Sequence, residues 1–157
     1  MLTPTTKIAL DSFAKKVVKN SKQRLARKNS DTRNLEGSIG YDLKVHKNSF
    51  SLTFSMLDYG SFVDEGVHGA KSSYTETKNS PFEFTKAIKP SAKHFMGWAK
   101  RKGLNPFAVR ESVWSKGTKP TNFFKKPFEY AFDQLPDLVV EQFGLDVDEF
   151  LEQALNI

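Results

Sequence analysis

The 157-residue chain contains no cysteine, which excludes disulfide bonds and thiolate metal sites and makes folding in a cytosolic compartment the simplest expectation. Long hydrophobic runs are absent as well. The N-terminal stretch has no continuous apolar segment of the kind that a secretion signal needs, and no window approaches the roughly 20 apolar residues of a membrane span. We therefore expect a protein that is not exported by a signal peptide and does not cross a membrane.

Motifs for nucleotide, metal or hydrolytic chemistry are also missing. The glycines follow neither GxxxxGK[ST] nor GxGxxG spacing, His46, His68 and His94 do not form an HExxH pair, and no serine lies in GxSxG. Asp64 and Glu65 are adjacent carboxylates, but neighbouring residues point apart on a helix or strand, so a structural or exposed role is the better interpretation. The sequence predicts a non-enzymatic protein with no catalytic, cofactor-binding or metal-ligating residue.

What the chain does have is the composition of a folded protein. Hydrophobic residues make up 38% and charged residues 27% of the sequence, which includes 14 phenylalanines. These proportions are typical of a globular chain, and the length suits one domain with a core of its own. We expect a single domain, 1–157, of the α+β class, in which a long N-terminal helix and C-terminal helices pack on a small, mostly antiparallel sheet.

Charge is distributed unevenly along the chain, whose formal net charge is +6. Residues 7–28 hold eight basic side chains and a single acid, Asp11, and residues 86–126 are basic apart from Glu111. From Glu129 onward, eight acids stand without a lysine or arginine. Two interpretations are open: solvated helix faces, or surfaces on which identical subunits dock basic side to acidic side or which turn toward DNA. The candidate interface or DNA-channel residues are Lys15, Lys16, Lys19, Lys22, Arg24, Lys100, Arg101 and Lys102.

Hydrophobic periodicity predicts the first elements. Apolar side chains recur at intervals of three and four residues over 4–28, which indicates one amphipathic helix with Thr3 as a candidate cap. Over 39–57, polar and apolar residues alternate on both sides of a Lys-Asn-Ser turn. This second pattern predicts an antiparallel hairpin with one buried face.

The middle of the chain is less regular. The stretch DYGSFVDEGVHG predicts a helical turn or two that stops at Gly66. The polar segment 68–90 that follows is long for a loop in a compact domain. It is interpreted either as an arm that reaches a neighbouring subunit or as a mobile surface loop, and the sequence leaves both open.

The remainder, 91–143, is predicted to be a helical part with one extended segment. A first helix ends at Gly103, and a second, short helix gives way to an extended pair at 113–114. A further helix runs to residue 143 and is bent or divided by Pro136. An acidic amphipathic helix over 145–156 completes the chain.

One basic stretch in this part, KPSAKHFMGWAKRKGLNP, mixes cations with aromatic residues. Such interleaving is a weak indication of nucleic-acid binding, in which lysines meet phosphates and aromatic rings stack on bases. Phe95 and Trp98 have helical spacing, however, which favours positions in the core.

Two short motifs resemble those of a known family. The first is a tyrosine-containing turn that leads through a valine and an acidic residue to a glycine, and the second is a Gly-Thr-x-Pro-x-x-Phe-Phe segment that opens a C-terminal helix. Together with the basic N-terminal helix, they resemble the minor tail-component or tail-completion family of long-tailed double-stranded-DNA bacteriophages. The likeness covers roughly residues 4–143. The matching residues are Tyr59, Val63, Glu65, Gly66, Gly117, Thr118, Pro120, Phe123 and Phe124.

The resemblance implies a structural virion protein, made in the host cytoplasm and placed in the neck or tail. There it would complete the tail or join head to tail as a ring of roughly six or twelve copies around the DNA passage. Its expected partners are identical subunits, other neck and tail proteins such as an adaptor, a stopper or a tail terminator, and passing DNA, without a cofactor or a membrane. Two alternatives remain: a tail-terminator or tail-tube subunit, and a basic DNA-binding module.

Overall fold

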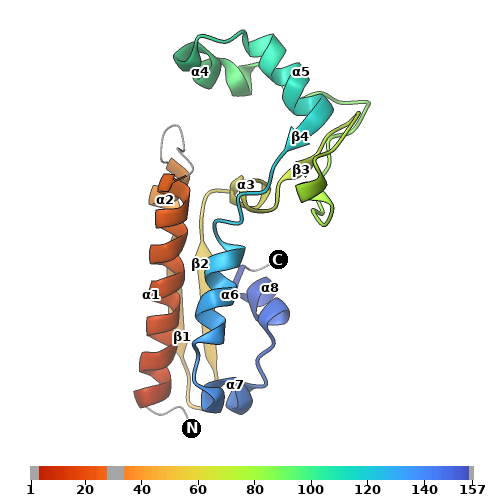
Figure 1. Ribbon diagram of the computed structural model, residues 1–157. Helices are drawn as coiled ribbons and strands as arrows, with labels where there is room; N and C mark the ends of the chain where they lie inside the picture. Colours follow the sequence, from red (N-terminus) through yellow and green to blue (C-terminus); the bar gives the residue numbers. More distant parts are fainter. Residues whose placement is uncertain (1–3, 28–33, 156–157) are drawn as a thin grey trace. The chain divides into compact units, whose positions relative to one another are not determined.

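The computed structural model describes residues 4–27 and 34–155 (Figure 1). Helices dominate this part of the chain, and its four short strands form two separate antiparallel pairs, which confirms the predicted α+β class. In chain order the elements are α1 (Pro4–Arg27), α2 (Asn34–Ser38), β1 (Gly40–Val45), β2 (Phe50–Ser55), α3 (Gly60–Glu65), β3 (Val67–His68), the 3₁₀ turn η1 (Thr75–Thr77), α4 (Lys93–Lys102), α5 (Pro106–Lys116), β4 (Gly117–Thr118), α6 (Lys125–Asp133), α7 (Asp137–Phe143) and α8 (Val147–Leu155).

The chain forms two compact units, which differs from the single domain expected from its length. Unit 1 combines residues 1–58 with 123–157, and unit 2 consists of residues 59–122. Unit 2 is therefore inserted between two segments of unit 1, and the chain passes between the units twice. No run of proline, glycine and serine marks either passage in the sequence, so composition alone did not reveal the division.

Helix α1 is the long amphipathic helix that the spacing of apolar residues predicts. The predicted last residue, Lys28, and the candidate cap, Thr3, lie outside the described residues. One face of the helix packs against α6 and β1 and excludes solvent because its apolar positions recur every three or four residues. The buried hydrophobic side chains of this face are Leu10, Phe13, Ala14, Val17 and Leu25.

Strands β1 and β2 form the predicted hairpin. They pair in antiparallel register from Gly40 opposite Ser55 to Val45 opposite Phe50. The inward positions of β2, which include the buried Phe54, face the helices of unit 1, and β2 packs against α8. The alternation of polar and apolar residues therefore located both strands and their buried face correctly.

Aromatic rings fill the core of unit 1. Phe13 meets Phe128 edge to face with ring centroids 5.2 Å apart, and Phe54 meets Phe124 in the same way at 5.1 Å. Phe150 of α8 stacks on Phe13 at 5.5 Å. Offset and edge-to-face contacts of this kind add about 0.5–1.5 kcal/mol per pair to the burial of the rings themselves.

The C-terminal helices of unit 1 follow the sequence signals closely. Pro136 separates α6 from α7, as predicted, and Gly144 ends α7 in the left-handed conformation with φ of 58°. The carboxylate of Asp146 accepts hydrogen bonds from the backbone N–H groups of Asp148 and Glu149, both at 3.1 Å. This cap starts α8, whose inner side carries the buried Phe150.

Unit 2 is built on a hairpin of two helices, α4 and α5. Gly103, with φ of 69°, ends α4, and the side chain of Asn105 caps α5 by accepting a hydrogen bond from the N–H of Phe107 at 2.9 Å. The extended segment predicted at 113–114 is wrong, because both residues lie inside α5. The helix continues to Lys116 and extended structure begins at Gly117, where a positive φ breaks the helical path.

The segment 68–90 is irregular apart from β3 and η1, and its first part is tied to unit 2. The backbone N–H of His68 donates to the carbonyl of Phe82, and the N–H of Phe84 donates to the carbonyl of His68, both at 2.9 Å. The N–H of Ala70 donates to the carbonyl of Trp114 at 2.8 Å. These bonds hold the segment against its own chain, and the expectation that it reaches a neighbouring subunit stays a prediction.

Candidate functional site

The two segments that carry the family resemblance meet in unit 2. Strand β3 pairs with β4 in antiparallel register, with Val67 opposite Thr118. We call this meeting point, formed by residues 63–69 and 115–122, the junction. It joins stretches that are separated by the whole α4–α5 hairpin in the sequence, so the two motifs together form one structural feature.

Hydrogen bonds extend the junction past the ends of the strands. The backbone N–H of Thr121 donates to the carbonyl of Val63 at 3.0 Å, and its hydroxyl donates to the same oxygen at 2.9 Å. The N–H of Asn122 donates to the carbonyl of Asp64 at 3.0 Å. The chain leaving unit 1 and the chain returning to it are therefore bound to each other directly after the first passage and directly before the second.

Two glycines of the motifs are required by this geometry. Gly66 has φ of 76°, and a Cβ atom there would lie 2.6 Å from the carbonyl oxygen of Thr118 and 2.7 Å from the nitrogen of Pro120. Gly117 has φ of 79°, and its Cβ atom would lie 2.0 Å from the carbonyl oxygen of Val67. Both the left-handed backbone and the close approach of two main chains exclude a side chain at these positions.

A third glycine of the junction was not singled out by the sequence motifs. A Cβ atom on Gly69 would lie 2.1 Å from the carbonyl oxygen of Ser72 and 2.4 Å from the carbonyl carbon of Lys116. Its only signal in the sequence is its place three residues after Gly66. Close packing of two main chains is a tertiary property, so the periodicity and spacing of residues in the sequence do not predict it.

The other motif residues divide between the two units. Tyr59 is exposed and Glu65 is half-buried, both in unit 2. Phe123 and Phe124 are fully buried in unit 1, where they precede α6. The second motif therefore spans the passage between the units, and its aromatic pair belongs to the core against which α6 packs.

The basic residues of α1 do not form one cluster. At 100° per residue, Lys15, Lys19 and Lys22 lie within about 60° of one another on the side away from the buried face. Lys16 lies about 60° beyond Lys19 and lines a shallow hollow with Lys15 and Lys19, whereas Arg24 lies near the edge of the core. Lys16 donates to the side-chain oxygen of Gln134 at 3.1 Å. A cationic stripe of three lysines is therefore what α1 presents.

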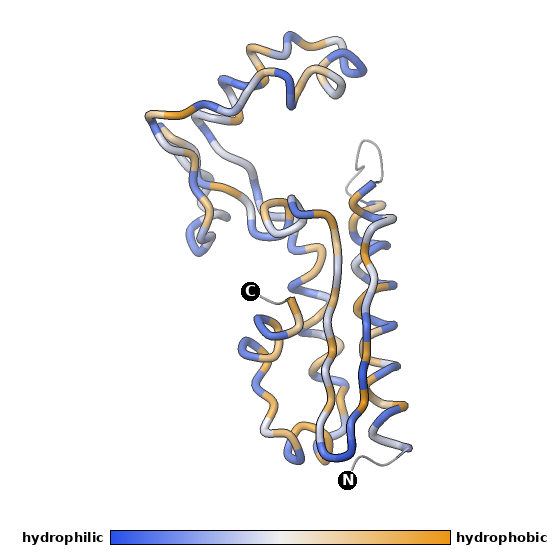
Figure 2. Tube along the Cα trace, turned by 180° about the vertical axis from the view of Figure 1, so that it is seen from behind, coloured by the Kyte–Doolittle hydropathy of each residue, from blue (hydrophilic) through white to orange (hydrophobic). Residues whose placement is uncertain are grey.

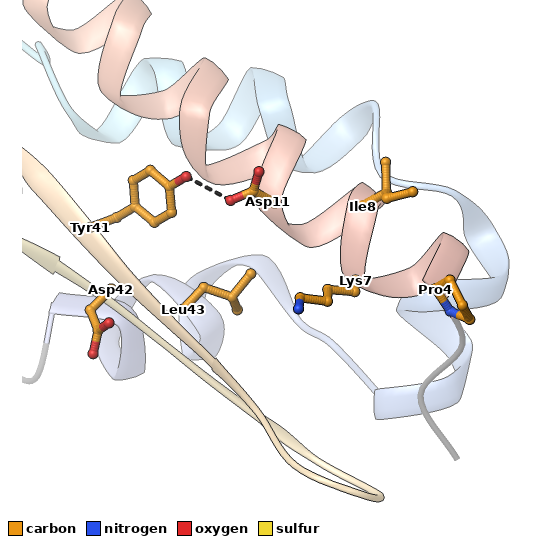
Figure 3. Close-up of a pocket in the computed structure, with 7 residues that line it drawn as sticks. All are labelled: Pro4, Lys7, Ile8, Asp11, Tyr41, Asp42 and Leu43. Atoms are coloured by element: carbon orange, nitrogen blue, oxygen red, sulfur yellow. Dashed lines mark hydrogen bonds between the residues drawn. The ribbon is translucent and has the colours of Figure 1, made fainter.

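The cationic stripe is partly neutralised at one end by a carboxylate. Lys15 lies 2.9 Å from Asp11, whose other oxygen accepts a hydrogen bond of 2.6 Å from the hydroxyl of Tyr41 (Figure 3). The hydrogen bond from Tyr41, with that from Lys15, lowers the pKa of Asp11, and the same bonds raise the pKa of Tyr41 and of Lys15. This network joins α1 to β1 and leaves Lys19 and Lys22 as the freer charges of the stripe.

An open hollow lies beside this network. It has a volume of about 650 Å³, and α1 and β1 supply its walls, which Figure 3 shows with Lys7, Leu43 and Asp42 around the Asp11–Tyr41 pair. Its charged groups are of both signs. The hollow is open to solvent, and its residues are neither a set of nucleophiles nor a set of metal ligands.

Helix α4 carries the second set of predicted basic residues. Lys100, Arg101 and Lys102 are exposed in the last turn of α4, where cations interact favourably with the helix dipole. The expectation that Trp98 is a core residue is wrong: it is 37% exposed, and Ala99 is the buried residue of this helix. Helix α4 is ten residues long and packs mainly against α5, so only one of its faces is covered.

The α4–α5 hairpin contains an apolar groove. Hydrophobic and hydrophilic positions alternate along both helices (Figure 2). The groove has a volume of about 380 Å³. We call it the hairpin groove; its lining is chiefly Trp98, Leu104, Ala108, Val109, Ser112 and Val113.

Net charge separates the two units. Unit 2 contains 11 lysines and arginines and 5 acidic residues, so it carries the whole formal charge of +6. Unit 1 contains 13 of each sign, with the acids concentrated from Glu129 onward. The uneven distribution seen in the sequence thus becomes a basic unit 2 and, in unit 1, a basic first segment beside an acidic last one.

Titratable side chains are dispersed over the described part of the chain. No group of three histidine, aspartate or glutamate residues there could hold a metal ion. His68 uses its ring to contact the hydroxyl of Ser73 at 3.3 Å and the carbonyl of Ser80 at 3.1 Å, and Asp64 is buried. Among the described helices, none combines the length and the apolar character needed to traverse a bilayer.

The features that stand out are therefore surfaces: the junction, the cationic stripe of α1, the basic end of α4 and the hairpin groove. Comparison of the chain with protein-family models, curated proteins and solved structures gives no match.

Proposed function

We propose that this chain is a structural subunit of the neck of a long-tailed double-stranded-DNA bacteriophage, where it completes the tail or joins head to tail as a ring around the DNA passage. The junction carries this proposal. Residues that resemble the tail-completion family, above all Gly66 and Gly117, are those that the paired main chains need. Because the backbone at these two positions admits only glycine, the resemblance concerns the local backbone geometry as well as the identity of the residues.

The distribution of charge supports the same role. A ring around DNA needs surfaces that bind neighbouring subunits and a lining that tolerates a polyanion. Unit 2 and the cationic stripe supply positive charge, and the segment from Glu129 onward supplies negative charge within the same chain. Complementary surfaces on one subunit favour head-to-tail contacts between copies.

The proposal is tested by deleting the coding sequence from the phage that carries it and imaging the lysate. We expect filled heads and separate tails, and we expect a plasmid copy of the intact chain to restore joined particles. A labelled chain located at the neck would support neck completion, whereas label at the tail end or along the tube would favour the tail-terminator or tail-tube alternative. Normal infectious particles without the chain would overturn all three.

A second candidate function, a basic DNA-binding module, is favoured by the net charge of unit 2. Such a module would bind DNA as an isolated monomer, with an affinity that falls steeply as salt is added because lysines and arginines displace counterions from phosphates. Fluorescence anisotropy of labelled duplex DNA at several salt concentrations distinguishes the two. Tight, salt-sensitive binding by a chain that never enters a particle would favour the module.

A further inference from the structure

The hairpin groove is an apolar surface that unit 2 leaves uncovered. Trp98 is 37% exposed and Leu104 is 49% exposed, and both line the groove. Lys102 follows Trp98 by four residues on α4, and Lys116 follows Ser112 by four residues on α5, so each cation lies on the same helix face as a groove residue. The groove is therefore an apolar hollow with positive charge at both helices.

Unit 1 displays a feature of the opposite kind. Leu138 in α7 is 73% exposed, although its neighbour Val139 is 4% exposed and belongs to the core. Asp137 precedes Leu138 and Glu141 follows it by three residues on the same side of the helix, and both are exposed. We call Asp137, Leu138 and Glu141 the acidic knob: one protruding aliphatic side chain with two carboxylates to one side of it, of which Glu141 shares its helix face and Asp137 lies four residues before Glu141.

We propose that the acidic knob of one copy of this chain docks into the hairpin groove of a second copy. Leu138 fills the apolar hollow, and the two carboxylates beside it meet Lys102 and Lys116. Burial of the exposed leucine side chain supplies most of the favourable free energy of docking, and the ion pairs set orientation and speed encounter more than they add affinity.

Charge complementarity favours a second copy over DNA as the occupant. Most of the side chains that line the groove are aliphatic or aromatic, and a nucleic acid has no protruding aliphatic group of the size of Leu138 to fill it. The knob itself carries two carboxylates, and α7 holds no lysine or arginine, so the knob is repelled by DNA and attracted to the cations of the groove. One chain thus carries both halves of the contact.

Knob and groove consist of different residues, so a contact between them in two copies is heterologous. Each docked copy presents a free groove or a free knob to the next, and such contacts close into a ring when the rotation between copies allows it. The inference deepens the proposed function by naming the surfaces through which the ring would form, and to that extent it rests on it. The docking itself is independent of where the protein acts.

Cross-linking tests the contact directly, because the chain has no cysteine of its own. Leu138→Cys and Ala108→Cys are made in separate chains of different mass, mixed, and treated with a short bis-maleimide. We expect a covalent heterodimer. Tyr130→Cys, at a 63% exposed position outside the knob, replaces Leu138→Cys in the matched control and should give background yield.

A chain that carries both Leu138→Cys and Ala108→Cys extends the test. Head-to-tail docking predicts a ladder of covalent oligomers that ends at the ring. The proposal would be overturned if the doubly substituted chain gave only an internally cross-linked monomer and the mixed single-cysteine chains gave no heterodimer. Equal yield from the Tyr130→Cys control would also overturn it. So would cross-linking that requires added DNA.

Sedimentation velocity supplies a second measurement with folded variants. Leu138→Asp is expected to weaken self-association at least tenfold while leaving the circular dichroism spectrum unchanged, and Tyr130→Asp is expected to leave association unchanged. Glu141→Lys should weaken association, and mixing that chain with Lys102→Glu should restore part of the loss. Equal association of Leu138→Asp and Tyr130→Asp would contradict the docking.

The two proposals fail separately. Particles that contain the chain at the neck, combined with absent cross-linking, would overturn the knob-and-groove contact and leave the neck role standing. A ladder of cross-linked oligomers, combined with absence of the chain from particles, would support the contact and overturn the neck role.

Discussion

Unit 1 and unit 2 reach a folded state by different physical means. Unit 1 buries a cluster of phenylalanines between α1, the hairpin and the C-terminal helices. Unit 2 buries four apolar side chains and relies on paired main chains with glycine at the points of closest approach. Apolar burial tolerates repacking, whereas close backbone contact tolerates no added atom. The four buried apolar residues of unit 2 are Val67, Ala92, Ala99 and Trp114.

The two units also differ in what they expose. Unit 1 balances its charges and covers most of its apolar side chains, but unit 2 keeps a net charge of +6 and leaves several large apolar side chains in solvent. Both tryptophans, Trp98 and Trp114, belong to unit 2, so tryptophan fluorescence reports on unit 2 and circular dichroism reports on both. This difference allows each change below to be assigned to a unit.

The largest effect is expected from Phe128→Ala in the core of unit 1. Phe128 is fully buried and contacts the rings of Phe13 and Phe150. Its removal leaves a cavity and should cost about 3–5 kcal/mol. In urea unfolding followed by circular dichroism, the transition of unit 1 should move to a lower urea concentration than in the unchanged chain. The transition followed by tryptophan fluorescence should shift less. Coincident loss of both signals would show that the units unfold as one.

Gly117→Ala is expected to destabilise unit 2 by about 2–3 kcal/mol, because the new Cβ atom meets the carbonyl of Val67 in a strained backbone region. The control is Gly103→Ala, which has a φ of 69° and a ψ of 29°, in the left-handed helical region that alanine enters at lower cost, and which has open space around the Cβ position. The control should cost about 1 kcal/mol. Tryptophan fluorescence during unfolding separates them, and equal costs would show that close approach contributes nothing.

A smaller effect, about 1–2 kcal/mol, is expected from Trp114→Phe. The indole N–H donates to the carbonyl of Thr85 at 2.8 Å, and the ammonium of Lys89 lies 4.6 Å from the ring centroid. Both contacts bind the segment 68–90 to α5. We expect faster proteolysis of that segment in the variant, measured by mass spectrometry of the fragments. Trp98→Phe is the control, and equal proteolysis in both variants would contradict this role.

Tyr41→Phe is expected to destabilise unit 1 by about 0.5–1 kcal/mol, since its bond to Asp11 is charge-assisted but partly exposed to solvent. The bond lowers the pKa of Asp11, so its contribution is complete above the ordinary value of 3.8 and is lost as the pH falls through the lowered pKa. It also raises the pKa of Tyr41, so the contribution is lost again as the pH rises above 10.0 through the raised pKa. Urea midpoints of both proteins across pH should differ between these limits and converge outside them.

The smallest effect on stability, about 0.5 kcal/mol or less, is expected when Lys19 and Lys22 of the cationic stripe are changed to glutamate, because neither is buried. If the cationic stripe faces the DNA passage, infectivity of the complemented phage should nevertheless fall. Lys44→Glu and Lys47→Glu, at exposed positions of the β1–β2 hairpin, provide a control with the same change of charge. Unchanged infectivity of the α1 variant would place the stripe away from DNA.

Prediction from the sequence succeeded where the pattern is local. The helix 4–28, the hairpin 39–57 and the break at Pro136 follow from periodicity and from proline chemistry, and the structure confirms them within the described residues. It failed at 113–114 and at Trp98, because both were judged by local apolarity and the surrounding fold decides which apolar face is covered.

The candidate site was partly predictable in the same sense. Gly66 and Gly117 were identified through the motifs, but their spatial partnership and the equal need for Gly69 were not. The basic residues of α1 were found as a group, and the helix geometry then separated Lys15, Lys19 and Lys22 from the others. No pattern in the sequence predicted the hairpin groove, because the helical spacing of Trp98 indicated a buried side chain.

The amino-acid sequence by itself determined the class of the fold, the long N-terminal helix, the β1–β2 hairpin, the break at Pro136 and the separation of charge along the chain, because these depend on residues close to one another. Tertiary structure alone decided that residues 59–122 form an inserted unit, that two distant motifs share one junction, and that an apolar groove remains open. Such features depend on which main chains come into contact across long separations, and short-range patterns of side chains hold no information about those distances.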